Sequence, residues 1–485
     1  MSYQVPQHID KDKIFIVRKS DIDRRLDPHY NRPSYNLLWN KLLSISNKLT
    51  TLKKESICIF SGITPKSGGE AYTIDKGIPF LRSGDFSEVN EIDFSKLLHI
   101  KENIHNTLMA NSHLKNGDLL VAIVGATIGK IGVYKYCDEA NINQAICAVR
   151  LQDTLNPYYV QAFLQTNIGQ KIIERIKRPV ARANINLEEV GNLPIPLLSP
   201  SLQKQIVEIM NNGRLQKQIK EAEAQQLLDS IDDYLLKELG IIVPTRYTSS
   251  IKNRIFTIKL ATIERDRLDS IYFDKKFRIL LDSIKGGIYP LHSLGDNDIT
   301  SFISTGQTPK SDCYTEDETD FPIIKAGSYK GYEIDLGKIS YTTKRQSHSA
   351  QKEDIFILSA AHQAEYIAKQ ICYLNETPKP NTSFVGELLC IRASALVNSM
   401  YLFSLLSTQV YKTLLNREKR GQTSHLYSND VSRILIPLPP IEKQNDIAKH
   451  IETLRLKAKT LQAEGKAILE DAKRKVEQMI IGNSK

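Results

Sequence analysis

The chain has 485 residues, a mass of 55.0 kDa and a formal net charge of +10. Because a single hydrophobic core stops growing near ~250 residues, this length predicts at least two domains. The content of 41% hydrophobic and 25% charged residues excludes a disordered or fibrous chain, and the positive charge is compatible with a polyanionic partner without identifying one.

The first predicted elements are short strands between turn residues. Runs rich in β-branched residues at 119–124 and 145–151 lie between Gly, Asn and Pro, which is typical of strands. Asn156, followed by a proline, is an N-cap with a first-turn proline and predicts a helix through about Glu174. Prolines bracket the next strand at 193–198. The first part of the chain should therefore be a β-rich domain.

Two long helices are predicted, from about Ser201 to Leu239 and from about Glu442 to Ile481, each followed by glycine. In the second helix, apolar residues recur at alternating steps of four and three, with Lys475 in one place, which is the spacing of a coiled-coil seam. The predicted seam is Ile447, Ile451, Leu454, Ala458, Leu461, Ile468, Ala472 and Met479. Each helix could instead pack on its own domain. However, a small β-rich domain cannot cover two helices of ~40 residues, so we expect them to cover each other.

The sequence contains an internal repeat: its two halves are similar, with a period near 242 residues. Three repeated pairs are RLDPHY (25–30) with RLDSIY (267–272), GITPKS (62–67) with GQTPKS (306–311), and NPYYVQAFLQT (156–166) with NSMYLFSLLST (398–408). The order of the pieces is the same in both halves. We therefore predict a β-rich domain over 1–199, a long helix over 200–240, a second β-rich domain over 241–440 and a second long helix over 441–485.

Two motifs that suggest catalysis do not match the full patterns of the enzymes that they resemble. Asn156-Pro-Tyr-Tyr159 resembles the motif with which adenine methyltransferases hold their target, but it lacks the second proline, and no upstream Gly-rich cofactor loop accompanies it. Gly125-Ala-Thr-Ile-Gly129-Lys has three residues between its glycines where a phosphate loop has four, so a strand-turn-strand is favoured. We therefore expect no catalytic, cofactor or metal residues.

Cationic loops are the best candidates for a binding surface. The segments 175–182 and 417–422 occupy the same place in both halves, between a helix and the proline-bracketed strand, and could be either DNA contacts or solvated helix ends. The two Thr-Pro-Lys-Ser segments fit turns better than base contacts, and Arg82 and Lys325 each precede a glycine by two residues. The candidates for DNA contact are Lys66, Arg82, Lys130, Arg178, Arg182, Lys310, Lys325, Lys330, Arg417, Lys419, Arg420 and Gln422.

Several pieces together resemble a known family. They include GITPKSGG, GIPFLRSGDF, GDLLVAIVGATIGKIGVY, ANINQA and IPLPPIEKQ, and most have a diverged counterpart in the other half of the sequence. Their order and the two long helices resemble the DNA specificity subunit of type I restriction-modification systems. The resemblance covers nearly the whole chain.

The resemblance implies two target recognition domains, each reading one half of a split double-stranded DNA target, and two helical regions that pair antiparallel. It also implies that two methylation subunits, which bind S-adenosylmethionine, dock on those helices, that restriction subunits join them, and that the chain itself is not catalytic and holds no cofactor. In the second half GATIGKIGVY becomes AAHQAEYIAK, which suits a different half-site. Alternatives are a specificity subunit of another defence methylase or nuclease system, a self-contained nuclease or methyltransferase, and a coiled-coil scaffold that binds no DNA.

Two further classes are excluded by composition. No apolar run approaches the ~18 residues of a membrane span, and the start of the chain lacks the apolar stretch of a signal peptide, so we expect a cytoplasmic protein. The six cysteines form no CxxC pair, and none lies beside histidine at zinc-ligand spacing, which predicts free thiols.

Overall fold

The computed structural model divides the chain into two compact units, each of which is described by itself. The first unit comprises residues 1–222 and 461–485, and the second unit comprises residues 223–460. Each unit therefore takes about half of α6 (Pro200–Glu238) and half of α12 (Ile441–Gly482). The structure describes residues 10–482 except 23–24, 44–48, 67–69, 75–76, 87–96, 137, 179–182, 245–254, 260–262, 264–266, 268, 362 and 422–423.

The first unit contains two four-stranded sheets, and a large core lies between one of them and a layer of helices. The central sheet has the order β2-β9-β6-β7 and the distal sheet the order β3-β5-β4-β8. These strands are β2 (Ser56–Ser61), β9 (Ile146–Leu151), β6 (Leu119–Ala122), β7 (Ile131–Val133), β3 (Tyr72–Thr73), β5 (Leu98–Ile100), β4 (Ile78–Leu81) and β8 (Asn141–Ile142).

The second unit repeats this topology strand for strand. Its central sheet begins β12-β21-β18-β19 and its distal sheet is β13-β17-β14-β20; β16 and β15 extend the central sheet. The strands are β12 (Thr300–Thr305), β21 (Leu388–Ala393), β18 (Ile355–Leu358), β19 (Ile371–Tyr373), β13 (Tyr314–Thr315), β17 (Ser340–Thr342), β14 (Pro322–Ile324), β20 (Ser383–Phe384), β15 (Tyr329–Lys330) and β16 (Glu333–Ile334). The predicted tandem of β-rich domains is confirmed.

Alternation along the central strands places apolar side chains on both faces of each central sheet. Leu119 and Val121 of β6 enter the core under the helices, whereas Leu120 enters the distal core. In β18, Ile355 enters the helix-side core and Phe356 the distal core. A strand that is buried on both faces has a continuous apolar sequence, and this pattern predicted the strand at 119–124.

The capping asparagines behave as predicted, but the helix expected through Glu174 is two helices. The Tyr158 amide donates to Asn156 Oδ1 (2.9 Å), which begins α3 (Pro157–Leu164). The hydroxyl of Thr166 then accepts from the Gly169 amide and begins α4 (Asn167–Ile176), so a second N-cap interrupts the run. In the second unit the corresponding helices are α9 (Ser399–Leu406) and α10 (Gln409–Arg417), capped by Asn398 and Thr408.

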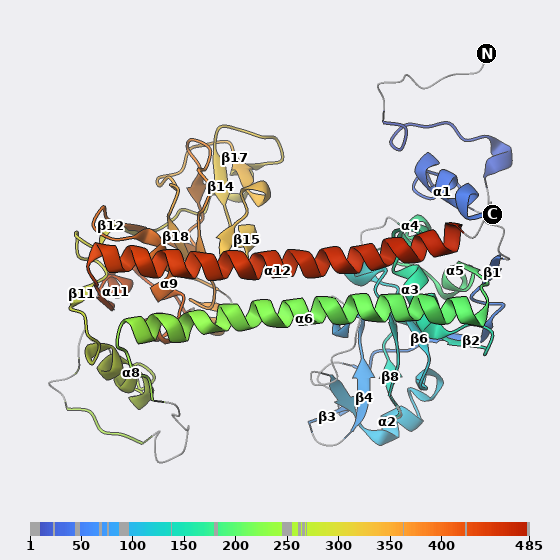
Figure 1. Cartoon of the computed structure of the whole chain (residues 1–485), viewed down its shortest axis with the longest axis horizontal. Helices are drawn as coiled ribbons and strands as arrows, with labels where there is room; N and C mark the ends of the chain where they lie inside the picture. The colour runs from blue at the N-terminus through green and yellow to red at the C-terminus, as the bar shows by residue number, and fades with distance from the viewer. Residues whose placement is uncertain are drawn as a thin grey trace. The chain divides into compact units, whose positions relative to one another are not determined.

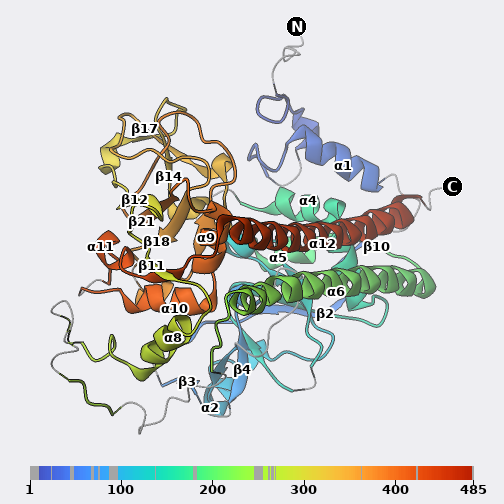
Figure 2. The ribbon, with the colours of Figure 1, turned by 60° about the vertical axis from the view of Figure 1, so that its left-hand side comes forward.

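The two long helices run antiparallel and side by side within each unit (Figures 1 and 2). In the first unit, Lys220 of α6 pairs with Glu464 of α12 (2.9 Å). A Cβ atom added to Gly213 of α6 would lie 2.7 Å from the Cβ atom of Ala472. In the second unit, the ring centroids of Tyr234 and His450 are 4.1 Å apart. The helices therefore approach closely in the first unit, where the small residues Gly213 and Ala472 face each other, and are joined by ring contact in the second unit.

The residues of the predicted seam are all buried or partly buried, and their role in pairing with α6 stays a prediction. Of its members, Ile447, Ile451, Ala458 and Ala472 are buried, and Leu454, Leu461, Ile468 and Met479 are partly buried. The place assigned to Lys475 is wrong, because that side chain is 62% exposed and Val476 and Ile480 are buried instead. A straight helix drifts relative to a 3.5-residue repeat, which moves the seam by one position near its end.

The seam residues also pack against the domain of their own unit. Ile206 and Met210 of α6 share one core with α3 and α4, and Ile447 and Ile451 of α12 share one with α9 and α10. Both expectations for the long helices therefore hold: each helix covers its partner and also completes the core of each unit.

Each β-rich domain is entered and left through one pair of antiparallel strands. β1 (Leu49–Thr51) pairs with β10 (Pro194–Pro196), and β11 (Leu291–Ser293) pairs with β22 (Leu435–Pro437).

The remaining helices are α1 (Pro33–Leu43), α2 (Glu102–Asn106), α5 (Leu187–Gly191), α8 (Lys275–Lys285) and α11 (Ser428–Val431). Within the described residues, no helix has the length and apolar content needed to cross a bilayer.

The close approach at Gly213 leads to a prediction. Gly213→Ala should gain ~1 kcal/mol of helix propensity, but its methyl group meets Ala472 and overpacking costs ~1–3 kcal/mol, so we expect net destabilisation. Gly213→Ala combined with Ala472→Gly should restore the stability, as measured by denaturant unfolding of the full chain. A single Gly213→Ala variant that is more stable than the parent would contradict tight pairing at this point.

Candidate nucleic-acid interface

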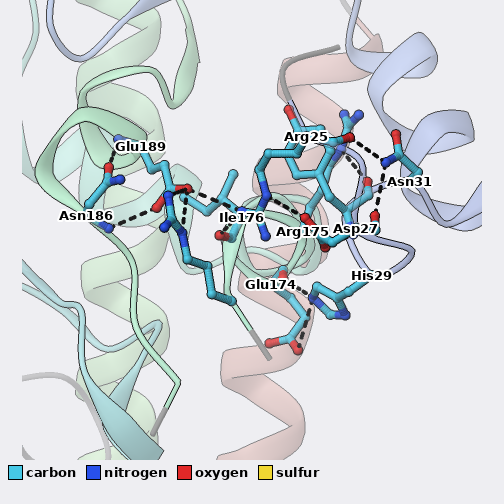
Figure 3. Close-up of polar contacts among 11 residues, drawn as sticks. Arg25, Asp27, His29, Asn31, Glu174, Arg175, Ile176, Asn186 and Glu189 are labelled. Atoms are coloured by element: carbon cyan, nitrogen blue, oxygen red, sulfur yellow. Dashed lines mark hydrogen bonds and ion pairs between the residues drawn. The ribbon is translucent and has the colours of Figure 1, made fainter. Parts of the chain in front are cut away.

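The repeated Arg-Leu-Asp segment anchors the cationic loop of each unit. In the first unit, Arg25 Nε donates to Asp27 Oδ2 (2.7 Å) and Arg25 Nη1 donates to the Ile176 carbonyl (2.6 Å) at the end of α4 (Figure 3). In the second unit, Arg267 Nε donates to Asp269 Oδ2 (2.7 Å). Burial acts to raise the pKa of Asp27, but the hydrogen bonds from Arg25 and a backbone amide outweigh it, so the pKa lies below its usual value.

The arginine at the end of the second capped helix is held inside each unit. The guanidinium of Arg175 stacks 4.4 Å from the Tyr30 ring, and that of Arg417 stacks 3.7 Å from the Tyr272 ring. Each also donates through Nε to the carbonyl of the same tyrosine. The Arg417 side chain is only 14% exposed. A side chain held in this way fits DNA contact poorly.

The next arginine in each loop faces outward and is ion-paired. Arg178 contacts Glu189 (2.9 Å) and is 47% exposed, and Arg420 contacts Asp430 (2.9 Å) and is 44% exposed. Lys419, between the buried and the exposed arginine, donates to Asn416 (2.9 Å), and burial and then the charge of Lys276 lower its pKa. Arg182 and Gln422 lie outside the described residues.

Backbone hydrogen bonds hold each cationic loop beside the turn that follows the central strand. The Gly125 amide donates to the Ala183 carbonyl (2.9 Å), and the Leu426 amide donates to the Ser359 carbonyl (2.8 Å). The prediction of a strand-turn-strand at Gly125 is confirmed, because a 3₁₀ turn joins β6 to β7 and both glycines there have positive φ. Lys130, at the end of that turn, donates to the Phe86 carbonyl (2.8 Å).

The cations near the two strand-end glycines differ between the units. Arg82 forms an ion pair with Asp85 (3.0 Å), whereas Lys325 Nζ lies 3.7 Å from the centre of the Tyr314 ring. Three other candidates, Lys66, Lys310 and Lys330, are exposed. Lys330 is 74% exposed and lies 4.0 Å from Asp335.

A cavity of about 740 Å³ in the second unit joins several of these segments. It is lined by Thr308 of the Thr-Pro-Lys-Ser segment, Lys325 and Gly327, and Gln363 and Tyr366 of the turn after β18. The cationic loop flanks it, because His425 pairs with Ala360, another lining residue. The structure thus brings together four segments that the sequence had singled out separately.

One group of possible metal ligands occurs in the described part of the chain, namely His105, His113 and Glu139. The two imidazole rings are stacked 3.8 Å apart with an interplanar angle of 7°, so no ion can lie in the planes of both rings. His105 instead contacts Asn141 Oδ1 (2.6 Å) and Glu139 Oε2 (2.8 Å). The group is a hydrogen-bonded network that links β8 to α2. The five described cysteines are unpaired.

Two buried glutamines that sequence reasoning missed join the capped helices to the long ones. Gln203 Oε1 accepts from the Asn156 amide (2.9 Å), and Gln444 Oε1 accepts from the Asn398 amide (3.0 Å). Both are at most 3% exposed. Their only sequence signal was position, because each glutamine lies seven residues after a proline of the bracketed strand, Pro196 or Pro437.

The comparisons with known proteins agree with this duplicated architecture. A family model described as the type I restriction modification DNA specificity domain matches twice, over residues 54–229 and 297–470. The chain belongs to this family. Each match contains one central and one distal sheet and continues into a long helix.

Members of the family that resemble the chain come from distant organisms. The EcoBI specificity subunit of Escherichia coli is 26% identical over 204 residues, which span 41% of this chain and only 38% of that protein. A putative MjaX specificity subunit of Methanocaldococcus jannaschii is 24% identical over 445 residues, 87% of this chain and 90% of that protein. The crystal structure of an S subunit from M. genitalium is 14% identical, with a TM-score of 0.40 over 90% of this chain and 96% of that one.

The contrast between buried and exposed arginines leads to a prediction. Arg175→Gln should lower the thermal stability of the full chain, because it removes a buried guanidinium from Tyr30 and Asn36. Arg178→Gln should leave stability nearly unchanged and weaken binding to duplex DNA, with a salt slope smaller by about one. Unaltered DNA binding by Arg178→Gln across a salt series would show that this loop is only a solvated helix end.

Proposed function

We propose that this specificity-family chain reads a split, asymmetric sequence in double-stranded DNA, with one half-site for each unit, and carries out no reaction itself. Methylation subunits that bind S-adenosylmethionine dock on the long helices and supply the chemistry, and restriction subunits join the larger complex. The observation that carries the proposal is the convergence of Thr308, Lys325, the turn after β18 and the cationic loop on one cavity of the second unit.

The same topology with different side chains supports two different half-sites. The segment between the central strand and its neighbour has eight residues in the first unit, from Ile123 to Lys130, and twelve in the second, from Ser359 to Gln370. Arg82 is neutralised by an aspartate, whereas its counterpart Lys325 lies over a tyrosine ring. Surfaces that differ in length and charge at the same place in the fold fit different base edges.

The cations would act in two ways. Exposed lysines and arginines release condensed counterions from the DNA, which gives salt-dependent binding without sequence preference. Side chains that reach base edges then discriminate between bases, by ~1–3 kcal/mol for each good bidentate contact. Two half-sites multiply this selectivity, because their free energies add.

Duplicated exposed leucines support two docking sites for methylation subunits. Leu215 lies twelve residues after Gln203, and Leu456 lies twelve residues after Gln444, so the two occupy equivalent positions. They are 53% and 67% exposed, and Ile219, one turn after Leu215, is 41% exposed. Exposed apolar side chains on a long helix fit a protein interface, and duplication of the position gives two such interfaces.

The proposed reading of DNA is tested by the methylation pattern of the native genome. With the gene intact, methylated bases should lie in a bipartite sequence whose two halves differ and flank an unspecified gap. Deleting the gene should remove methylation at every such site while other methylation persists. A symmetric target, or a pattern that does not depend on the gene, would contradict the proposal.

The proposed docking sites are tested by the mass of the native complex. Leu215→Glu or Leu456→Glu alone should leave one methylation subunit per chain, and the double variant should leave none, because a buried carboxylate opposes docking. Ile57→Glu, at an apolar residue of β2 that is 68% exposed, is the matched control and should leave two. Two bound subunits in the double variant would place the docking surface elsewhere.

A further inference from the structure

The cavity of the second unit contains a cation and a carboxylate on neighbouring walls. Lys325 Nζ lies 3.7 Å from the centre of the Tyr314 ring, and both residues line the cavity. No ion pair of Lys325 occurs among the described residues. An ammonium that is held by a ring and faces a cavity keeps its hydrogen-bond donors available for a ligand.

Glu387, the carboxylate that lines the same cavity, is held in place by Thr308. The Gly386 amide donates to Thr308 Oγ1 (2.9 Å), so the hydroxyl proton is directed to Glu387 Oε2 (2.8 Å). Among the residues that the structure describes, no group donates a hydrogen bond to Glu387 Oε1. Tyr314 and Glu387 line the same cavity, and burial and then the charge of Glu387 raise the pKa of Tyr314.

On the basis of the proposed function, we infer that this cavity reads one G·C base pair of the half-site assigned to the second unit. Lys325 donates to the guanine N7 and O6 acceptors, and Glu387 accepts from the cytosine amino group, in the major groove. Lys325 is thus a specificity-determining residue, and Glu387 reads the partner base of the same pair.

The charges also reject two of the other three base pairs. With C·G, the ammonium would face the cytosine amino group and the carboxylate would face guanine O6, so both contacts would be repulsive. With A·T, the carboxylate would face thymine O4, another acceptor. With T·A both contacts stay attractive, because thymine O4 accepts from the ammonium and the adenine amino group donates to the carboxylate, but thymine offers Lys325 one acceptor where guanine offers two. The opposite charges therefore select the orientation of the base pair, and the second guanine acceptor favours G·C over T·A.

Other cations of the second unit fit this role less well. Arg417 is stacked inside the unit, Lys419 is hydrogen-bonded to Asn416, and Arg420 is ion-paired with Asp430. Lys330 is 74% exposed and does not line the cavity, so it can meet the DNA backbone without selecting a base. It differs from Lys325 in environment but not in charge, which makes it a matched control.

The experiment introduces Lys325→Gln, Glu387→Gln and Lys330→Gln separately into the native gene and maps genomic methylation. Lys325→Gln should relax one G·C position in one half of the target, so that sites with another base there gain methylation relative to the parent by about 5- to 150-fold. Glu387→Gln should relax the same position. Lys330→Gln should leave every base preference unchanged, and no variant should alter the other half-site.

Each outcome separates this inference from the proposed function. A split, gene-dependent target whose relevant half contains no G·C pair, or whose base preferences are unchanged in Lys325→Gln, overturns the inference and leaves the proposed function standing. The same relaxation in Lys330→Gln also overturns it. If melting of the purified full chain shows that Lys325→Gln is unfolded, Glu387→Gln decides, and unchanged preference there overturns the inference. Absence of gene-dependent methylation in the parent instead overturns the proposed function.

Discussion

The antiparallel contact between the two long helices is the constraint on which the rest of the structure depends. A Cβ atom added to Gly213 would clash with Ala472, and one added to Gly465 would make tight contacts with Lys217 and Lys220. Helices that approach this closely bury their seam residues and at the same time place Ile206 and Ile447 under the domain helices. Neither helix could be removed without opening the core of both units.

The β-rich domains are inserted into this frame through narrow connections. The pairs β1–β10 and β11–β22 bring the entering and leaving segments of each domain together in a two-stranded ladder. The Arg25 and Arg267 anchors then fix the cationic loop from outside the sheet. With the frame and the anchors constant, the turns after β6 and β18 can change length and charge without disturbing either core.

Much of the frame could be predicted from the sequence, because it depends on local signals. The repeat, the capping asparagines and the ends of the long helices come from residue types with strong positional preferences, and the structure confirms them within one or two residues. The break at Thr166 was missed, although threonine is a residue type that caps the start of a helix. The displacement of Lys475 by Val476 was missed because seam drift depends on the partner helix.

The candidate interface was less predictable, since it depends on long-range contacts. Sequence could list Lys325 and Arg417 as cations but could not tell that one lies over a ring in a cavity and the other is stacked inside the unit. Glu387 was not singled out, because a single acidic residue at a strand start has no local signature. The structure makes Glu387 a candidate because Thr308, which is distant in the sequence, donates a hydrogen bond to it.

An exchange of domains tests the central claim that one frame holds two independent readers. Residues 291–437, from β11 to β22, are replaced by residues 49–196, from β1 to β10, and the methylation pattern directed by the chimaera is mapped. Two copies of one reading domain on an antiparallel helix pair should recognise a symmetric target, made of two inverted copies of the half-site of the first unit. A target that keeps the original asymmetry would contradict the account.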